Sequence, residues 1–233
     1  MIAPDLIGFG FSSKPWPYQY TFKEQAEMVI ALMAYLNLDK VHILAHDYGD
    51  SVTQELLAMK QVNKMEPFKI CSICFLNGGL FMEATSPNRV QRILLTPLGP
   101  LVAYLFTMSK LKKNFISIFG KHTPPSTEEI AAFWQLITHN QGKRIIPGLI
   151  QYIRERKIKR DYWLMSMQNT KVPMRLVIGA EDPISGKSIA KRYEQLIPNP
   201  DVVLLSEVGH YPQIEAAEKV LDHYCQFIDR IGN

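Results

Sequence analysis

One transition from strand to helix, near residue 47, constrains the fold of this chain more than any other feature. The apolar run of residues 41–45 ends abruptly at His46 and Asp47, and Gly49 and a helical pattern follow. This order is typical of a nucleophile elbow, a tight turn that exposes the side chain at its apex. The alternative is an ordinary turn in which Asp47 caps the helix, since Asp is a favoured cap. This stretch alone does not separate the two.

The residue at the apex determines what chemistry such an elbow could perform. Esterases and lipases place a serine there, whereas this chain has the carboxylate of Asp47. A carboxylate that attacks a saturated carbon forms an alkyl ester. The expected substrate is therefore an epoxide or a similar alkylating electrophile, rather than an ester or a peptide.

Length and composition limit the other classes of function. The 233 residues are 47% hydrophobic, which suits one soluble, globular domain or one domain with an insertion. A formal net charge of +4 is too weak to indicate nucleic acid as a partner. The residues after Met1 include no basic region, so we expect no signal peptide. The longest uncharged stretch, residues 93–109, is short and contains prolines, so it predicts a sticky surface or the lining of a lipophilic pocket rather than a membrane span.

The cysteines give no sign of a metal centre or a disulfide framework. Cys71 and Cys74 lie two residues apart within an apolar, strand-like run, and no second Cys or His pair stands nearby to complete a zinc site. We expect small buried side chains in a reducing, cytoplasmic compartment, with no metal and no cofactor.

Strand and helix patterns alternate along most of the chain. Strands are predicted at 41–45, 70–76, 172–179 and 202–205, with the tail of another at 2–6, and helices between them, which indicates a parallel sheet covered on both faces. Residues 80–169 show no strand pattern, only helical stretches punctuated by prolines, one of which begins at Ser126. A basic cluster in the last of these stretches is interpreted as a solvated helix face rather than a patch for anionic partners: Arg154, Arg156, Lys157, Lys159 and Arg160.

Three candidate catalytic groups each follow the carboxyl end of a predicted strand: Asp47, Asp182 and His210. In a parallel sheet these ends share one edge, so the groups can converge. Asp47 would attack carbon, and His210 would then act as general base for the water that hydrolyses the enzyme ester. Asp182 would orient and stabilise the imidazole. Singly, Asp182 could form an Asx turn and His210 a polar loop, but three matched positions favour the catalytic interpretation.

These motifs resemble the α/β-hydrolase superfamily, in the branch of epoxide hydrolases and haloalkane dehalogenases. The matching residues are Asp5, Gly8, Gly10 and Ser12, the elbow from His46 to Gly49, the turn Glu181-Asp182-Pro183, and Gly209-His210 with Pro212. The resemblance implies an α/β-hydrolase fold with a core of residues 1–79 and 170–233 and a helical cap of residues 80–169. It also implies a small lipophilic substrate.

The resemblance assigns further residues of the site. It implies that the backbone N–H of Tyr48 is an oxyanion donor. Epoxide hydrolases use cap tyrosines to hydrogen-bond the epoxide oxygen, and Tyr152 and Tyr162 are the candidates here, although either could equally be a packing residue. Haloalkane dehalogenases place a tryptophan after the nucleophile, and Tyr48 at that position disfavours halide chemistry.

The sequence departs from the family pattern at its start. Family members begin with several strands and a His-Gly-x-Pro loop that donates the other oxyanion contact, and no such motif occurs here. We therefore expect the first three strands to be missing, as in a truncated gene model, a splice form or a partial sequence, leaving the elbow strand without one partner. A binding or scaffold protein without catalysis, or an inactive truncated form, is the alternative function. The resemblance also points to an endoplasmic reticulum membrane setting for a full-length form.

Overall fold

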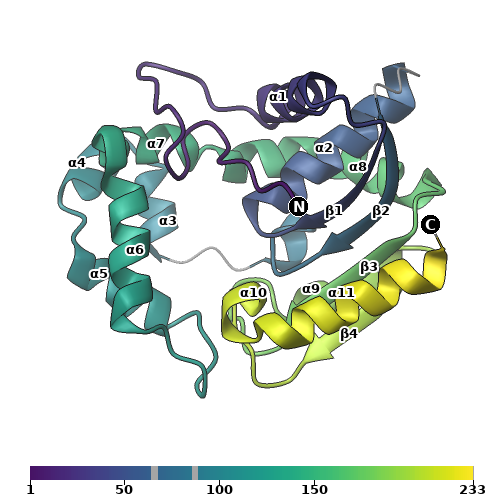
Figure 1. Cartoon of the computed structure of the whole chain (residues 1–233). Helices are drawn as coiled ribbons and strands as arrows, with labels where there is room; N and C mark the ends of the chain where they lie inside the picture. The colour runs from purple at the N-terminus through teal and green to yellow at the C-terminus, as the bar shows by residue number, and fades with distance from the viewer. Residues whose placement is uncertain (64–67, 86–88, 233) are drawn as a thin grey trace.

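Four parallel strands form the sheet in the computed structural model, which describes residues 1–63, 68–85 and 89–232 (Figure 1). The strands are β1 (Lys40–Ala45), β2 (Lys69–Phe75), β3 (Met174–Gly179) and β4 (Val202–Leu205), in the order β1-β2-β3-β4. Every neighbouring pair is parallel. The predicted parallel sheet is confirmed, with strand bounds within two residues of those expected from the sequence.

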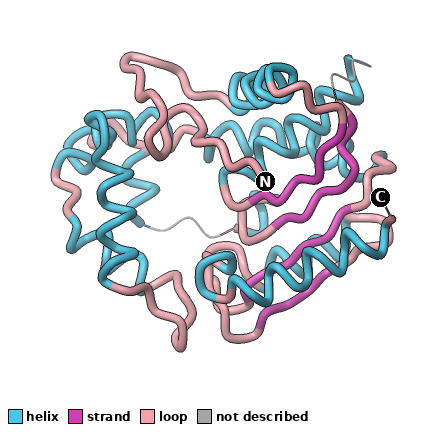
Figure 2. Tube along the Cα trace, viewed as in Figure 1, coloured by secondary structure: helices cyan, strands magenta, loops and turns pink. Residues whose placement is uncertain are grey.

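Helices and loops make up the rest of the described chain (Figure 2). They are α1 (Phe22–Tyr35), α2 (Tyr48–Asn63), α3 (Arg89–Leu94), α4 (Gly99–Tyr104), α5 (Met108–Ile116), α6 (Thr127–Thr138), α7 (Ile146–Leu149), α8 (Tyr152–Asn169), α9 (Lys187–Leu196), α10 (Pro212–Glu215) and α11 (Ala217–Ile231), with short 3₁₀ helices at Met82–Ala84 and His139–Ile145. Helix α6 begins where the sequence predicts, because the Ser126 hydroxyl and the Glu129 carboxylate cap each other's backbone N–H.

The alternation of side chains along the strands buries both faces of the sheet. In β3, Leu176 and Ile178 face a core shared with α1, α2 and α9, whereas Val177 faces a second core that includes Phe227 of α11. All three strand residues are fully buried. In Figure 1, α11 lies along β3 and β4, and α1 and α2 lie beside β1 and β2.

The helices from α3 to α8 occupy the chain between β2 and β3. Helices α3 to α7 form a group to one side of the sheet, whereas α8 returns to pack along α2 (Figure 1). No strand occurs in the described part of residues 80–169, as predicted. The apolar stretch 93–109 runs from the end of α3 through α4 to the start of α5. Leu98 and Leu101 are exposed, whereas Pro100 and Tyr104 line a second pocket, so the stretch contributes to both a surface and a pocket. None of the described helices is long and apolar enough to cross a membrane.

At residues 2–6 and along the outer side of β1, the described backbone has no neighbouring strand. Residues 2–6 were expected to be the tail of a strand, but they form no strand, because no described neighbour pairs with them. Strand β1 lies at one edge of the described sheet, as expected, and its Leu44 is exposed. Cys74 is buried as predicted, whereas Cys71 on the opposite face of β2 is only half-buried, and both are free thiols.

The contact between α2 and α8 depends on a buried carboxylate. Glu55 of α2 is 2% exposed and accepts hydrogen bonds from Lys159 at 2.7 Å and from the Trp163 indole at 2.6 Å. The indole is itself 1% exposed. A buried charge without partners is costly, so this arrangement is stable only while both donors stay in place.

We predict that Glu55→Ala lowers the free energy of unfolding by about 2–4 kcal/mol, because it leaves the buried Trp163 N–H without an acceptor and Lys159 with only its longer contact to Glu155, at 3.5 Å. Urea titration measures this change. The control is Glu27→Ala in the exposed Lys23–Glu27 pair of α1, for which we expect less than about 1 kcal/mol. Equal effects of the two substitutions would contradict the assigned role of Glu55.

Candidate active site

The turn between β1 and α2 holds Asp47 in an unusual backbone conformation. Its φ is +44°, in the left-handed region that L residues rarely adopt but that Asp tolerates better than most. The N–H of Asp47 donates to the Asn77 carbonyl at 2.9 Å, which ties the turn to the end of β2. Helix α2 begins at the next residue, Tyr48, whose N–H has no acceptor within the helix. The sequence prediction of a sharp elbow with Asp47 at its apex is confirmed.

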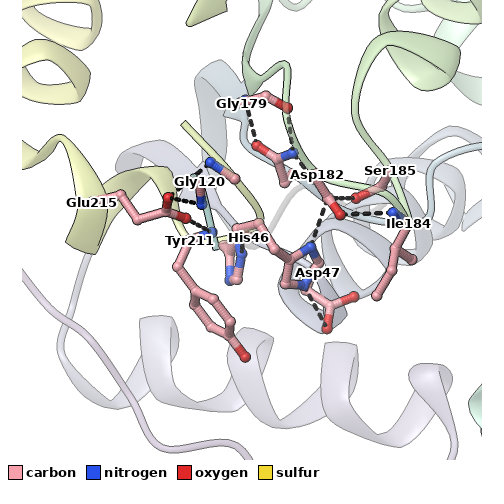
Figure 3. Close-up of polar contacts among 12 residues, drawn as sticks. His46, Asp47, Gly120, Gly179, Asp182, Ile184, Ser185, Tyr211 and Glu215 are labelled. Atoms are coloured by element: carbon pink, nitrogen blue, oxygen red, sulfur yellow. Dashed lines mark hydrogen bonds and ion pairs between the residues drawn. The ribbon is translucent and has the colours of Figure 1, made fainter. Parts of the chain in front are cut away.

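The structure brings together the three groups that the strand ends predict. His210 Nδ1 donates to Asp182 Oδ2 at 2.7 Å, and His210 Nε2 lies 3.8 Å from Asp47 Oδ2 (Figure 3). The side chains of His210 and Asp182 are 6% and 0% exposed, whereas that of Asp47 is 36% exposed. The imidazole therefore stands between a buried carboxylate and a carboxylate that solutes can reach.

Hydrogen-bond donors from four residues hold the Asp182 carboxylate in place. Besides the imidazole, its carboxylate accepts hydrogen bonds from Asn77 Nδ2 at 3.0 Å, from the Ser185 hydroxyl at 2.5 Å and from the N–H of Ile184 at 2.8 Å. Figure 3 shows Ser185 and Ile184 converging on this carboxylate. Asn77 in turn exchanges two hydrogen bonds with the backbone of Gly179 at the end of β3. This network holds the two strand ends, and hence Asp182, in one position.

Charge interactions set the protonation of the three groups. Burial alone would lower the pKa of His210, but contacts with Asp182 and Asp47 outweigh it and raise that pKa to about 10. Burial alone would raise the pKa of Asp47, but His210 and Arg156 hold it well below its usual range. The pKa of Asp182 is also lowered, because the contact with His210 outweighs burial. At neutral pH the site therefore holds two carboxylates and an imidazolium.

Arg156 contradicts the interpretation of the basic cluster as a solvated face. Its side chain is 6% exposed, and its Nη2 donates to the Asp47 carbonyl at 2.8 Å and to Asp47 Oδ1 at 3.2 Å. Its Nε donates to Ser51 at 2.8 Å. Lys159 of the same cluster is also engaged, by Glu55. These residues face α2 because α8 packs on that helix, a contact that the one-dimensional charge pattern does not reveal.

A second carboxyl near the elbow was not singled out from the sequence. Asp50 is 0% exposed, and neither of its oxygens has a hydrogen-bond partner among the described residues. Burial and the charge of Asp47 raise the pKa of Asp50 well above its ordinary value. Gly78 lies against this carboxyl, where a Cβ would collide with it. The sequence indicates this carboxyl only through its spacing, since Asp50 follows Asp47 by about one helical turn.

An open pocket leads to Asp47. The empty space in it is about 390 Å³ when the open solvent at its mouth is included, and its lining residues are Asp47, Gly79, Met82, Thr85, Gln91, Tyr152, Ile153, Arg156, Ile184, Ser185 and His210. Of the two tyrosines expected from the family resemblance, one lies at the pocket and one does not. Tyr152 lines the pocket, whereas Tyr162 does not and is 37% exposed. Ten residues along α8 correspond to an advance of about 15 Å, which carries Tyr162 away from the site.

The side chain of Tyr48 packs beside the elbow and does not reach the pocket. Its ring is 6% exposed and packs against Phe9 and Phe22, each with ring centroids 4.7 Å away. The ring does not line the pocket. Among the described residues there is no group of His, Cys, Asp and Glu arranged to hold a metal ion.

The Glu215 carboxylate binds several backbone N–H groups of the loop that carries His210 and of a neighbouring segment. Glu215 accepts hydrogen bonds from the N–H groups of Gly209 and Tyr211, both at 2.8 Å, and of Gly120 at 2.7 Å (Figure 3). The N–H of His210 itself donates to the Ile118 carbonyl at 2.8 Å. The histidine loop is thus fastened both to its own helix α10 and to the segment that follows α5.

His46 supports the same loop from the elbow side. Its Nε2 lies 2.7 Å from the His210 carbonyl, which can only accept, so Nε2 is the donor. Burial lowers the pKa of His46 to about 4, so the ring is neutral near pH 7. The sequence places His46 beside Asp47, but only the fold shows that it contacts the second histidine.

Stability is expected to depend on the ionisation of His210. Its pKa is 6.5 when unperturbed and about 10 in the fold, so its contribution to the free energy of unfolding is complete below pH 6.5 and is lost as the pH rises towards 10. Urea titrations from pH 6 to 10 should show this loss in the parent chain and a flatter curve in His210→Gln. Parallel curves for the two proteins would contradict the raised pKa.

We predict that Glu215→Gln lowers both the free energy of unfolding and the turnover rate. The NH₂ group of the glutamine would replace a carboxylate oxygen that now accepts a hydrogen bond from a backbone N–H. The expected loss is about 1–3 kcal/mol in the free energy of unfolding, as for a buried donor left unpaired. Glu218→Gln on α11 is the control, since Glu218 is exposed. Unchanged unfolding and turnover in Glu215→Gln would rule out the fastening role.

Comparison with known proteins agrees with this geometry. A family model described as alpha/beta hydrolase fold matches residues 1–217. The mesoderm-specific transcript protein of Mus musculus is 35% identical over 235 residues, which cover 98% of this chain and 70% of that protein. LipZ of Mycobacterium tuberculosis, whose name classes it as a hydrolase, is 36% identical over 215 residues, covering 92% of this chain and 74% of LipZ.

A solved structure shares the fold at lower sequence identity. The epoxide hydrolase CorEH superposes with a TM-score of 0.74 at 18% identity, and the match covers 98% of this chain and 81% of that chain. This likeness concerns the fold alone. Together, the family model, the two relatives and the strand-end arrangement of Asp47, Asp182 and His210 show that the chain belongs to the α/β-hydrolase fold family.

Proposed function

We propose that the chain is an epoxide-hydrolase-like enzyme that works through an aspartyl-ester intermediate, with Asp47 as nucleophile, His210 as general base and Asp182 as the group that orients the imidazole. The observation that carries the proposal is the continuous line of contacts from Asp47 Oδ2 to His210 Nε2, at 3.8 Å, and from His210 Nδ1 to Asp182, at 2.7 Å. A serine hydrolase would need a hydroxyl at the apex, and this chain presents an ionised carboxylate there.

The first step forms the ester. Asp47 Oδ2 attacks a ring carbon of the epoxide, the carbon–oxygen bond breaks, and its electron pair passes to the oxygen, which takes up a proton. Tyr152 is our candidate donor of that proton, because it lines the pocket and its hydroxyl oxygen accepts from Gln91 at 3.4 Å, leaving its O–H available to a substrate. Tyr162 is withdrawn from this role because it does not line the pocket.

The second step hydrolyses the ester. Once Asp47 is esterified, its charge no longer raises the pKa of His210, so the imidazolium releases its Nε2 proton to solvent more readily and the neutral imidazole can act as a base. His210 Nε2 takes a proton from water, and the water oxygen attacks Cγ of Asp47. The resulting oxyanion collapses, the bond from Cγ to Oδ2 breaks, and the product alcohol receives the proton from His210. The second proton of the water stays on the regenerated Asp47 carboxyl, which ionises and returns a proton to the Tyr152 phenolate, and His210 regains its resting proton from solvent. The backbone N–H of Tyr48 is the proposed oxyanion donor, because it has no acceptor within α2.

The substrate class follows from the pocket and from Tyr48. Met82, Ile153 and Ile184 give the pocket apolar walls, which supports a lipophilic group beside the reacting carbon. An epoxide needs no separate site for a departing ion, because its leaving oxygen remains attached to the product. The Tyr48 ring is buried outside the pocket, which disfavours a halide site there and hence haloalkane chemistry.

We also propose the domain division that the sequence predicts. Residues 1–79 and 170–233 would form the core, and residues 80–169 a helical cap over the strand ends. The division is supported by Tyr152 and Arg156, which enter the pocket from the helical side and face Asp47 and His210 from the strand ends.

The proposal predicts a trapped intermediate. His210→Gln should form the Asp47 ester but fail to hydrolyse it, so incubation with lipophilic epoxides such as styrene oxide should add one substrate mass to the peptide that contains Asp47. His42→Gln is the matched control, because His42 lies on β1 and contacts Ser72 at 2.8 Å, away from the pocket. Asp47→Asn should give no adduct.

Isotope labelling distinguishes this route from direct attack by water. In a single turnover of the parent chain in ¹⁸O water, the label should enter the Asp47 carboxylate rather than the diol. Label in the diol alone, or an epoxide series that yields neither adduct nor turnover, would sink the proposal. If the enzyme releases halide from a chloroalkane and turns over no epoxide, it would be assigned to the haloalkane dehalogenases instead.

A further inference from the structure

Arg156 contacts the one oxygen of Asp47 that the proposed attack leaves unused. Its Nη2 lies 3.2 Å from Oδ1, whereas Oδ2 faces His210. If Oδ2 bonds to the substrate carbon, Oδ1 becomes the carbonyl oxygen of the ester. The same oxygen then receives the negative charge when water attacks Cγ.

We propose that Arg156 is a catalytic oxyanion donor for hydrolysis of the Asp47 ester, supplied by helix α8 rather than by the strand-end loops. This inference rests on the proposed aspartyl-ester mechanism. Donors aimed at the oxygen where charge develops contribute most when they are fixed in a site sheltered from water. A guanidinium adds a full positive charge to that contact, which a backbone N–H does not.

Three contacts, besides the one to Oδ1, hold the guanidinium in place before the reaction. Nε donates to Ser51 at 2.8 Å, Nη2 also donates to the Asp47 carbonyl at 2.8 Å, and the guanidinium carbon lies 4.5 Å from the centre of the Tyr152 ring. Gly79 leaves room on the remaining side, where an added Cβ would lie 2.5 Å from Nη1. The carbonyl contact fixes Arg156 to the backbone of the nucleophile, so it stays aligned when the carboxylate becomes an ester.

The electron balance of the step is complete with the groups described. The water oxygen forms a bond to Cγ, its proton passes to His210 Nε2, and the π electron pair of the carbonyl moves onto Oδ1, facing Arg156. When the pair returns, the bond from Cγ to Oδ2 breaks and the product oxygen takes the proton from His210. Arg156 exchanges no proton at any stage, since its guanidinium stays charged.

The donor role makes a prediction that a structural ion pair does not. In Arg156→Gln we expect ester formation from styrene oxide to change by less than about 10-fold, because Oδ2 is untouched, and ester hydrolysis to slow by about 100- to 1000-fold, the usual loss for one oxyanion donor. The Asp47 ester should therefore accumulate with His210 intact. Rapid-quench mass analysis of the Asp47 peptide gives both rates.

Three further variants serve as controls. Lys157→Gln removes the same charge from an exposed site one residue away and should leave both rates unchanged. Arg156→Lys keeps the charge but cannot bond Ser51 and Asp47 together, so hydrolysis should recover only in part. Gly79→Ala displaces the guanidinium through a side chain outside the ion pair, and it should slow hydrolysis selectively even if Arg156→Gln does not fold.

The outcomes separate this inference from the proposed function. If Arg156→Gln and Gly79→Ala slow ester formation and ester hydrolysis equally, or leave hydrolysis unchanged, the donor role is overturned. A trapped ester in His210→Gln would still support the aspartyl-ester mechanism in that case. If His210→Gln forms no ester with any epoxide, the nucleophile assignment falls and the donor role falls with it.

Discussion

The site depends on a carboxylate held between two cations. Asp47 occupies the end of an edge strand in a strained conformation, and its charge is balanced by Arg156 on one oxygen and by protonated His210 on the other. Both partners are almost fully buried, so neither is well hydrated without the carboxylate. Removing the Asp47 charge would leave both cations without this partner in a medium of low polarity. The elbow, the helical segment and the histidine loop therefore stabilise one another through this point.

Much of the framework could be predicted from sequence because it rests on local patterns. Short apolar runs bounded by turn residues located the four strands, and their carboxyl ends located Asp47, Asp182 and His210 without any knowledge of the fold. The rule that parallel strands end at one edge was sufficient to bring these groups together. What it could not supply was the spacing between side chains, such as the 3.8 Å between His210 and Asp47.

The parts that sequence reasoning missed depend on contacts between distant segments. Arg156 looked like one of five solvated cations, and only its position against α2 shows that it is buried. Glu215 carries no motif, yet it fastens three backbone N–H groups from two loops. The choice between Tyr152 and Tyr162 required the direction of α8 relative to the pocket. In each case the deciding factor was a helix-to-helix or loop-to-loop contact with no trace in local composition.

Helix α8 contacts α2 through side chains at positions 156, 159 and 163, which lie along one stripe of the helix. All three are polar donors with fixed acceptors, so a slide of α8 by one helical turn, about 5.4 Å, would break every one of them at once. The place of the guanidinium beside Asp47 is therefore set by the register of α8 against α2, and a change of register would withdraw that charge from the carboxylate.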